Sequence, residues 1–159
     1  MAGRQNRAIK EIANRDIISR ERIERAYIFI QIPDRNFVEM FTPQIFMHNS
    51  GKTPAIIKKV RAYYQTTNVG EIIPSLISHS LSESRISDGL VIAADKRYEI
   101  SIRGEPITED VKNHNKTMHI IGVVEYKDVF GNIHESGFDW QSQGGEFIIS
   151  PNDKLNYYT

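Results

Sequence analysis

The spacing of apolar side chains changes at Ala26, and this change limits the folds that the chain can adopt. Residues 6–25 repeat their apolar positions about every 3.6 residues, as an amphipathic helix does. From Ala26 onward the period is two, and Ile28, Ile30 and Ile32 alternate with other residues, as in a strand with one buried face. The pattern therefore predicts one N-terminal helix followed by a mainly β domain.

The expected helix carries an apolar stripe along one side. Its members are Ile9, Ile12, Ala13, Ile17 and Ile23, and charged residues occupy much of the remaining surface. An isolated helix of about 20 residues is only marginally stable in water. Residues 1–25 are therefore expected either to pack on the β domain or to form a stalk, and the stripe is a possible contact for a homo-oligomer.

Alternating runs separated by turn residues continue to residue 150. They predict an immunoglobulin-like antiparallel β-sandwich of seven to nine strands over residues 26–150. The polar tail, 151–159, is expected to fray. After the first strand, the expected strands run over residues 37–48, 56–65, 98–102, 117–127, 133–141 and 144–150. Residues 68–88 and 104–116 are expected to form long polar loops.

Two of these strands have a defined face. In residues 56–65 the residues expected on one face are Ile56, Val60, Ala62 and Tyr64. In residues 117–127 one face is expected to hold Met118, Ile120, Val124 and Tyr126, whereas Ile121 and Val123 make the opposite face apolar as well. A strand that is apolar on both faces belongs in the middle of a sheet.

Turn chemistry supports the β interpretation at two places. In residues 48–55, Asn49 can bond its own backbone, Gly51 can adopt positive φ, and Pro54 requires an extended exit. Residues 128–132 form the second turn, which joins the expected strands over residues 117–127 and 133–141.

Composition excludes several classes of site and partner. The 20 basic and 20 acidic residues balance, which argues against nucleic acid or an anionic membrane surface as the main partner. The chain has no cysteine, so disulfides, thiolate nucleophiles and cysteine metal sites are excluded. No apolar run reaches the roughly 18 residues of a membrane span, and no signal peptide is visible.

The residues suggest no catalytic, cofactor-binding or metal-binding site. The string Gly51-Lys52-Thr53 is not a P-loop, because Phe46 stands where that motif requires glycine. The five histidines are interpreted as surface residues, although His119 and His134 facing each other across the last hairpin would offer two metal ligands. Glu135 and Asp139 share a strand face and are interpreted as solvated charges.

The most plausible ligand face at this stage is aromatic. It comprises Tyr63, Tyr64, Phe138 and Trp140, for which core packing is the commoner role because aromatic side chains supply much of the buried area of a sandwich.

Three short strings resemble those of a group of uncharacterised bacterial membrane-tethered proteins. The strings are Arg25-Ala26-Tyr27, the Asn49-x-Gly51-x-Thr53-Pro54-Ala55 turn and the Tyr126-x-Asp128-x-Phe130-Gly131 turn. The resemblance covers about residues 5–140. It implies a helical stalk that carries an immunoglobulin-like domain, tethered to a membrane by a segment absent from this chain, and it implies no catalytic residues.

These observations lead to three functional hypotheses. The leading one is a non-enzymatic module, extracytoplasmic and membrane-associated, that binds a protein or itself through loops. The second is a small-molecule or carbohydrate-binding sandwich that uses the aromatic face. The third, a hydrolase, requires a histidine and a carboxylate that converge in one cleft. No cofactor is expected in the leading hypothesis.

Overall fold

The computed structural model describes residues 2–32, 44–73, 89–102 and 107–159. Residues 37–43 of the expected strand over 37–48, residues 74–88 of the expected loop over 68–88 and residues 104–106 of the expected loop over 104–116 therefore lie outside the described residues.

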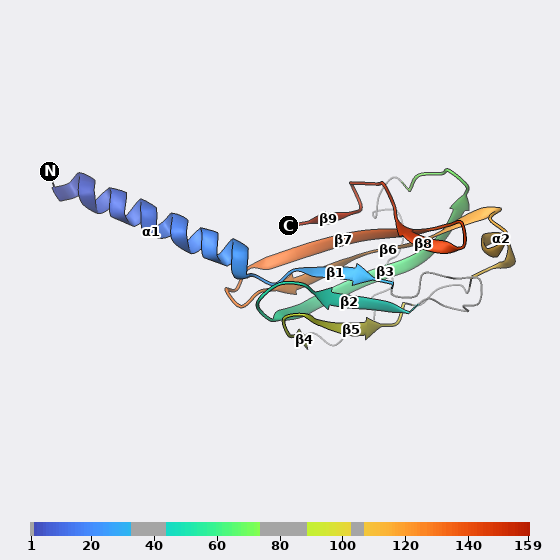
Figure 1. Ribbon diagram of the computed structural model, residues 1–159, viewed down its shortest axis with the longest axis horizontal. Coiled ribbons are helices and arrows are strands. Elements are labelled where there is room, and N and C mark those ends of the chain that lie inside the picture. Colours follow the sequence, from blue (N-terminus) through green and yellow to red (C-terminus); the bar gives the residue numbers. More distant parts are fainter. Residues whose placement is uncertain (1, 33–43, 74–88, 103–106) are drawn as a thin grey trace.

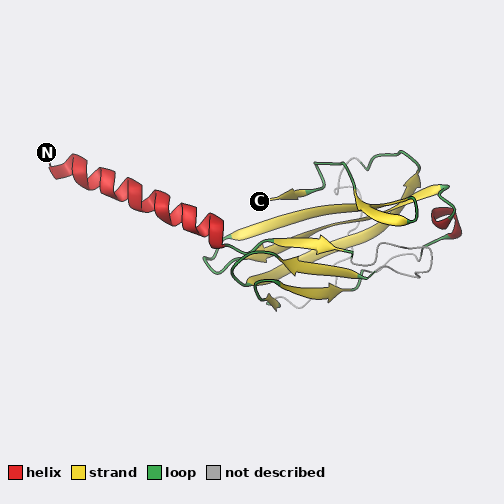
Figure 2. Cartoon of the chain, in the orientation of Figure 1, coloured by secondary structure: helices red, strands yellow, loops and turns green. Residues whose placement is uncertain are grey.

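The described chain is mainly β, as predicted, and its strands are antiparallel (Figure 2). The helices are α1 (Ala2–Glu24) and the short α2 (Glu109–Lys112), where a loop without a helix was predicted. The strands are β1 (Ile28–Gln31), β2 (Ile45–Asn49), β3 (Ala55–Asn68), β4 (Val91–Ile92), β5 (Lys96–Ile100), β6 (Lys116–Lys127), β7 (Ile133–Gln143), β8 (Glu146–Ile149) and β9 (Tyr157–Tyr158).

The strands form two sheets over one core (Figure 1). The first sheet has the order β1-β2-β5, and the second has the order β4-β3-β6-β7-β8, with β9 paired to β7. Strand β4 contacts β5 and β1 contacts β7, so the sheets curl toward each other in a form like half of a barrel. The central position of β6 agrees with its apolar residues on both faces.

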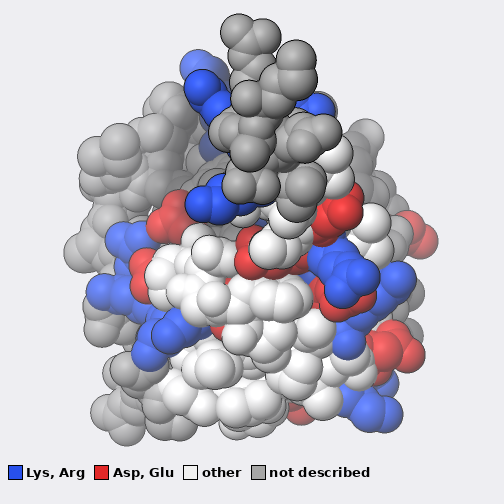
Figure 3. Space-filling model, turned by 90° about the vertical axis from the view of Figure 1, so that its left-hand side faces the viewer, with Lys and Arg blue, Asp and Glu red and all other residues white. Residues whose placement is uncertain are grey.

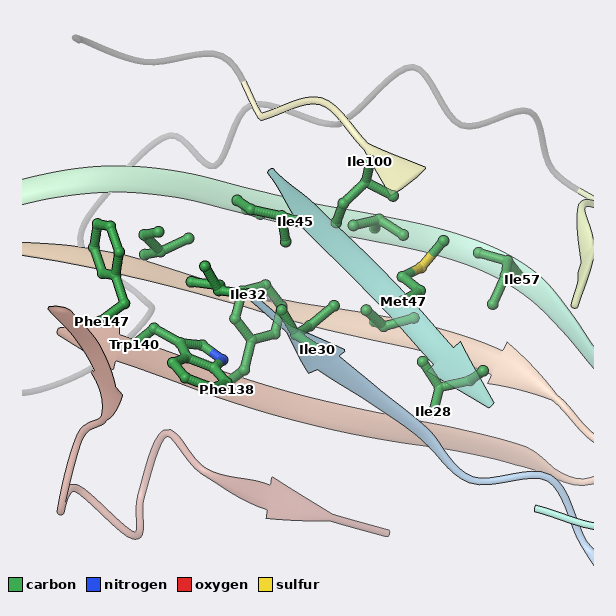
Figure 4. Close-up of a cluster of buried hydrophobic side chains, with 14 of the residues drawn as sticks. Ile28, Ile30, Ile32, Ile45, Met47, Ile57, Ile100, Phe138, Trp140 and Phe147 are labelled. Atoms are coloured by element: carbon green, nitrogen blue, oxygen red, sulfur yellow. The ribbon is translucent and has the colours of Figure 1, made fainter. Parts of the chain in front are cut away.

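The space between the sheets is filled by aliphatic and aromatic side chains (Figure 4). Ile28, Ile30 and Met47 of the first sheet face residues of the second that include Phe138 and Trp140. Burial of a large apolar side chain stabilises a fold by roughly 1.5–3 kcal/mol, so this cluster supplies the main driving force for folding.

One predicted strand face is wrong at its first residue because β3 contains a bulge. The register with β6 shifts between Ile57 and Lys59, and Ile57 is fully buried whereas Ile56 is only half-buried. An extra residue in one strand reverses which side chains point inward. Val60 and Ala62 lie beyond the bulge and are buried as predicted.

The Asn49 side chain fixes the turn between β2 and β3. Its Oδ1 accepts hydrogen bonds from Tyr27 N (3.2 Å) and Gly51 N (3.0 Å), and its Nδ2 donates to Thr53 O (2.8 Å) and Ile92 O (3.0 Å). A Cβ at Gly51 would overlap the backbone of Arg25 and Ala26. This turn therefore has a structural role, because it ties both sheets to the end of α1.

The C-terminal residues are packed, and the prediction of a frayed tail is wrong. Strand β9 pairs with Ser136 and Gly137 of β7, and Leu155 is 2% exposed. A Cβ at Gly137 would overlap the Tyr157 ring, so glycine allows the close approach of this segment. Residues 151–159 are mostly polar, so their composition alone did not indicate that Leu155 is buried or that several side chains bond to the backbone.

Helix α1 extends away from the β domain (Figure 1). Its side chains from Lys10 to Arg20 are exposed, and the Tyr27 hydroxyl donates to Arg22 O (2.9 Å) where the helix meets the domain. Neither helix in the described part of the chain is long and apolar enough to cross a membrane.

Candidate functional site

The face of the second sheet that points away from the first sheet carries a second, smaller apolar cluster. It consists of Tyr63, Ile73, Ile121 and Leu155. We call residues 69–73 and 150–156, which lie over this face, the cover. Asn152 Nδ2 donates to Ile73 O (2.9 Å), so the two parts of the cover are joined to each other.

The cover is attached to the sheet at Asp139. The backbone N–H of Asp139 donates to Asn156 Oδ1 (2.9 Å), and the backbone carbonyl accepts from Ser150 N (2.9 Å). Asn156 Nδ2 also donates to Ser150 O (2.8 Å). These bonds satisfy backbone groups of β7 and hold polar loop residues against the sheet.

A cavity of about 720 Å³, which we call the far cavity, lies between the cover and the ends of β3, β6 and β7 that are distant from α1. This volume lies within the usual range of small-molecule sites. The lining residues are Val69, Gly70, Glu71, Ile72, Ile73, His114, Lys116, Thr117, His119, Gln141, Ser142, Gln143, Gly144, Ser150, Pro151, Asn152, Asp153 and Lys154.

A buried histidine–aspartate pair lies at this cavity. His119 Nδ1 is 2.9 Å from Asp139 Oδ1, and the two residues are 2% and 1% exposed. Because a carboxylate only accepts hydrogen bonds, Nδ1 carries the proton and donates it. The Nε2 atom of His119 is then the acceptor of the neutral ring, and it is buried with no hydrogen-bond partner among the described residues.

Other buried polar atoms around this pair are also unsatisfied within the described part of the chain. They are Asp139 Oδ2, Gln65 Oε1 and Thr67 Oγ1. The strand register explains their proximity, because Gln65 is directly opposite His119 and Thr67 is opposite Thr117. Each such atom costs about 1–3 kcal/mol when it has no partner, and of these four residues His119 is the one that lines the cavity.

The charge of Asp139 also reaches Tyr63. The pKa of the Tyr63 hydroxyl is raised, first by burial and then by the nearby carboxylate of Asp139. Tyr63 and Asp139 both pair with Ile121, one on each side, so their side chains share this face of the sheet.

The arrangement does not provide an activated nucleophile. Ser142 Oγ accepts from Met118 N (2.8 Å), and Ser150 Oγ accepts from Asn152 N (3.3 Å), so both hydroxyls serve the backbone. A triad needs a hydroxyl within hydrogen-bond distance of the histidine, and no described residue supplies one to His119 Nε2. No group of three or more metal-ligating side chains occurs among the described residues.

The predicted aromatic face is not one face. Tyr63 lies under the cover, whereas Tyr64, Phe138 and Trp140 pack at the core between the sheets. Burial raises the pKa of Tyr64 to about 12. Successive residues of a strand point to opposite sides, which separates Tyr63 from Tyr64. Phe138 and Trp140 also line a smaller cavity of about 320 Å³ together with residues of β1.

Two of the histidines predicted at the surface are buried, and they do not face each other. His119 is opposite Gln141, whereas His134 is opposite Tyr126 at the other end of the hairpin. Asp139 is likewise buried rather than solvated. The proximity of His119 and Asp139 could have been predicted from the sequence. Once residues 128–132 form the turn, the strand register places Asp139 diagonally across from His119 on one face.

The second histidine joins a buried cluster at the end of the domain near α1. His134 Nε2 is 2.7 Å from Asp128 Oδ2, and His134 Nδ1 is 3.2 Å from Arg25 Nη1 and 3.1 Å from Thr159 O. Nε2 donates to Asp128, and Nδ1 lies near a donor and an acceptor, so it accepts from Arg25 when the ring is neutral and donates to Thr159 O when the ring is charged. We call His134 and Asp128 the junction pair.

Asp128 is the most completely bonded side chain of the junction. Its Oδ1 accepts from Phe130 N and Asn132 N, both at 2.9 Å. Burial opposes the charged form, but hydrogen bonds from His134 and Asn132, together with the charge of His134, outweigh it and lower the pKa of Asp128.

Comparison of the chain with protein-family models, with curated proteins and with solved structures finds no match.

Proposed function

We propose that this protein is a non-enzymatic binding module whose β domain holds a small polar molecule in the far cavity. One observation carries the proposal: His119 Nε2 is a buried acceptor without a partner among the described residues, on a side chain that lines a cavity of about 720 Å³. The Asp139 carboxylate fixes the ring in this orientation, so the acceptor is preorganised. No residue in the described ranges aligns a hydroxyl with His119 Nε2, and this arrangement supports binding more than hydrolysis.

A fragment screen of the full chain by two-dimensional NMR tests this function. Fragments of several chemical classes, each at millimolar concentration, should shift the amide signals of residues 116–119 and 141–144. The amides of β1 and β2 should stay in place and serve as an internal control. If no fragment of any class shifts the signals around the cavity, the proposed function is wrong.

A second candidate function, self-assembly, is favoured by the exposed apolar side chains of α1. Ile12, Ile17 and Ile23 are 60%, 55% and 62% exposed on a helix that extends into solvent. Viewed from the α1 side, the domain shows basic and acidic side chains around an uncharged central area (Figure 3). Helices with such a stripe bury it against another surface.

Sedimentation of the full chain and of a form that lacks residues 1–24 tests this second function. The shorter form should stay folded and show weaker self-association. Equal masses for the two forms would contradict self-assembly through α1. Unfolding of the shorter form would show instead that the helix stabilises the domain.

We also propose that the β domain is an immunoglobulin-like sandwich and that the protein is tethered to a membrane. Two antiparallel sheets around one core support the first, and the three strings around Arg25, Asn49 and Asp128 support the second. Fractionation of the native cells, followed by protease treatment from outside, tests the tether. An extracytoplasmic, membrane-associated protein should sediment with membranes and be cleaved.

A further inference from the structure

We propose that the far cavity binds a neutral polyhydroxylated ring, a sugar or a cyclitol, through a hydroxyl group that donates to His119 Nε2. The inference rests on the proposed function and names the chemical class of its ligand. It follows from three properties of the cavity: the kind of unsatisfied atom, the balance of charge and the apolar side chains of the lining.

The unsatisfied side-chain atom that the cavity offers is an acceptor. His119 lines the cavity, and its Nε2 accepts because Nδ1 already donates to Asp139. Asp139, Gln65 and Thr67 are not among the residues that line the cavity. An occupant that satisfies His119 Nε2 must bring a hydrogen-bond donor. A carboxylate or a phosphate brings acceptors to an atom that already accepts, and it is therefore disfavoured.

The charge of the lining distinguishes between two ligands that donate hydrogen bonds, a neutral hydroxyl compound and an ammonium ion. The lining contains the cations Lys116 and Lys154 and the anions Glu71 and Asp153, whose formal charges cancel, whereas the Asp139 carboxylate lies behind His119 and not in the lining. An ammonium ligand needs a net negative site to replace its hydration. A hydroxyl group donates without carrying charge, so the neutral ligand is favoured.

Apolar side chains of the lining accommodate the carbon skeleton of such a ring. Val69, Ile72 and Ile73 line the cavity, and Ile72 is 75% exposed. A six-membered polyol presents hydroxyl groups at its edge and C–H groups on its faces. The cavity offers polar atoms and apolar side chains that match these two parts.

Titration of the full chain with three probes that share a six-membered ring tests the inference. The probes are myo-inositol, cyclohexanecarboxylate and cyclohexylamine, which is an ammonium ion at pH 7. Myo-inositol should shift the amides of residues 116–119 and the Nε2 signal of His119, with a dissociation constant on the order of 1 mM. The other two probes should bind at least about tenfold more weakly, the loss expected for unmatched hydrogen bonds.

Two matched variants locate the contact. In His119→Asn the amide nitrogen can replace Nδ1 as the donor to Asp139, while the Nε2 acceptor is lost, so myo-inositol binding should weaken about tenfold. His48→Asn is the control, because His48 lies on β2 of the other sheet, where its Nε2 is 3.4 Å from Asp95 Oδ1. This variant should bind myo-inositol as the unmodified protein does.

Each outcome is decisive. If the carboxylate or the ammonium probe occupies the cavity and myo-inositol does not, the ligand class is wrong and the proposed binding function stands. If myo-inositol binds without moving the His119 Nε2 signal, the assigned contact is wrong. If neither myo-inositol nor any fragment of the wider screen binds, the inference and the proposed function both fail. The Nε2 measurement uses the unmodified protein, so it holds even if His119→Asn does not fold.

Discussion

The β6–β7 hairpin carries a buried histidine–aspartate pair at each end, and the two pairs differ in how completely their polar atoms are bonded. At the junction, Asp128 accepts hydrogen bonds at both oxygens, and His134 has partners at both ring nitrogens. At the far cavity, only one bond joins His119 to Asp139, and the outer atom of each side chain lacks a partner in the described structure.

The difference separates a structural cluster from a candidate site, although the residue types are the same. A fully bonded buried pair has no capacity left for a ligand, and it ties α1, the hairpin turn and the C-terminal residues together. An incompletely bonded pair beside a cavity retains binding capacity at the expense of stability. The comparison predicts that substitutions at the junction affect folding most, whereas those at the far pair affect binding most.

Asp128→Ala should have the largest effect on stability. It leaves His134 and two turn amides without their acceptor in a buried place, so the free energy of unfolding should fall by about 3–5 kcal/mol. Urea denaturation followed by circular dichroism measures the loss. Asp153→Ala, at an exposed position of the cover, is the matched control and should change stability by less than about 0.5 kcal/mol. Similar losses for the two variants would refute the structural role of the junction pair.

Leu155→Ala should weaken the cover over the far cavity. Leu155 is 2% exposed in the small apolar cluster, and its truncation should cost about 2–3 kcal/mol, the lower part of the usual range, because the surface segment can adjust. Hydrogen exchange should become faster at the Asp139 amide and stay unchanged at the Asn132 amide. Faster exchange at both amides would mean that the two ends of the hairpin are not independent.

Acid should destabilise the junction through Asp128. The pKa of Asp128 in the folded protein is below its ordinary value of 3.8, so the carboxylate stabilises the fold above that value. This contribution is lost as the pH falls below about 4 and through the pKa of the folded state. Denaturation between pH 7 and pH 3 should therefore show a larger loss of stability for the unmodified protein than for Asp128→Asn. Parallel losses would contradict the assignment.

The smallest effect on stability should come from His119→Asn. Because asparagine keeps a donor for Asp139, the cost should stay below about 1 kcal/mol. In His134→Asn the same change removes the bond from Nε2 to Asp128, so the cost should reach about 2–3 kcal/mol. Thermal denaturation of the two variants side by side measures the contrast, and equal costs would remove the distinction between the pairs.

Much of the hairpin could be predicted from the sequence, since alternation over residues 117–127 and the turn at 128–132 define both strands. The bulge after Ile57 could not, because one inserted residue leaves no mark in the pattern of apolar positions. The far site was missed for a different reason. Asp139 lies on a face of its strand that also carries Glu135 and Gln141, and polar faces usually meet water. Here the face is buried by the cover, whose anchoring bonds from Asn152 and Asn156 leave no periodic pattern.

The tautomers of the two buried histidines test the central claim most directly. Long-range proton–nitrogen NMR of the full chain at neutral pH reports which ring nitrogen carries the proton. His119 should be protonated at Nδ1, with Nε2 as a free acceptor, and His134 should be protonated at Nε2. A proton on Nε2 of His119 in the neutral ring would contradict the account, because the far cavity would then present a donor instead of an acceptor.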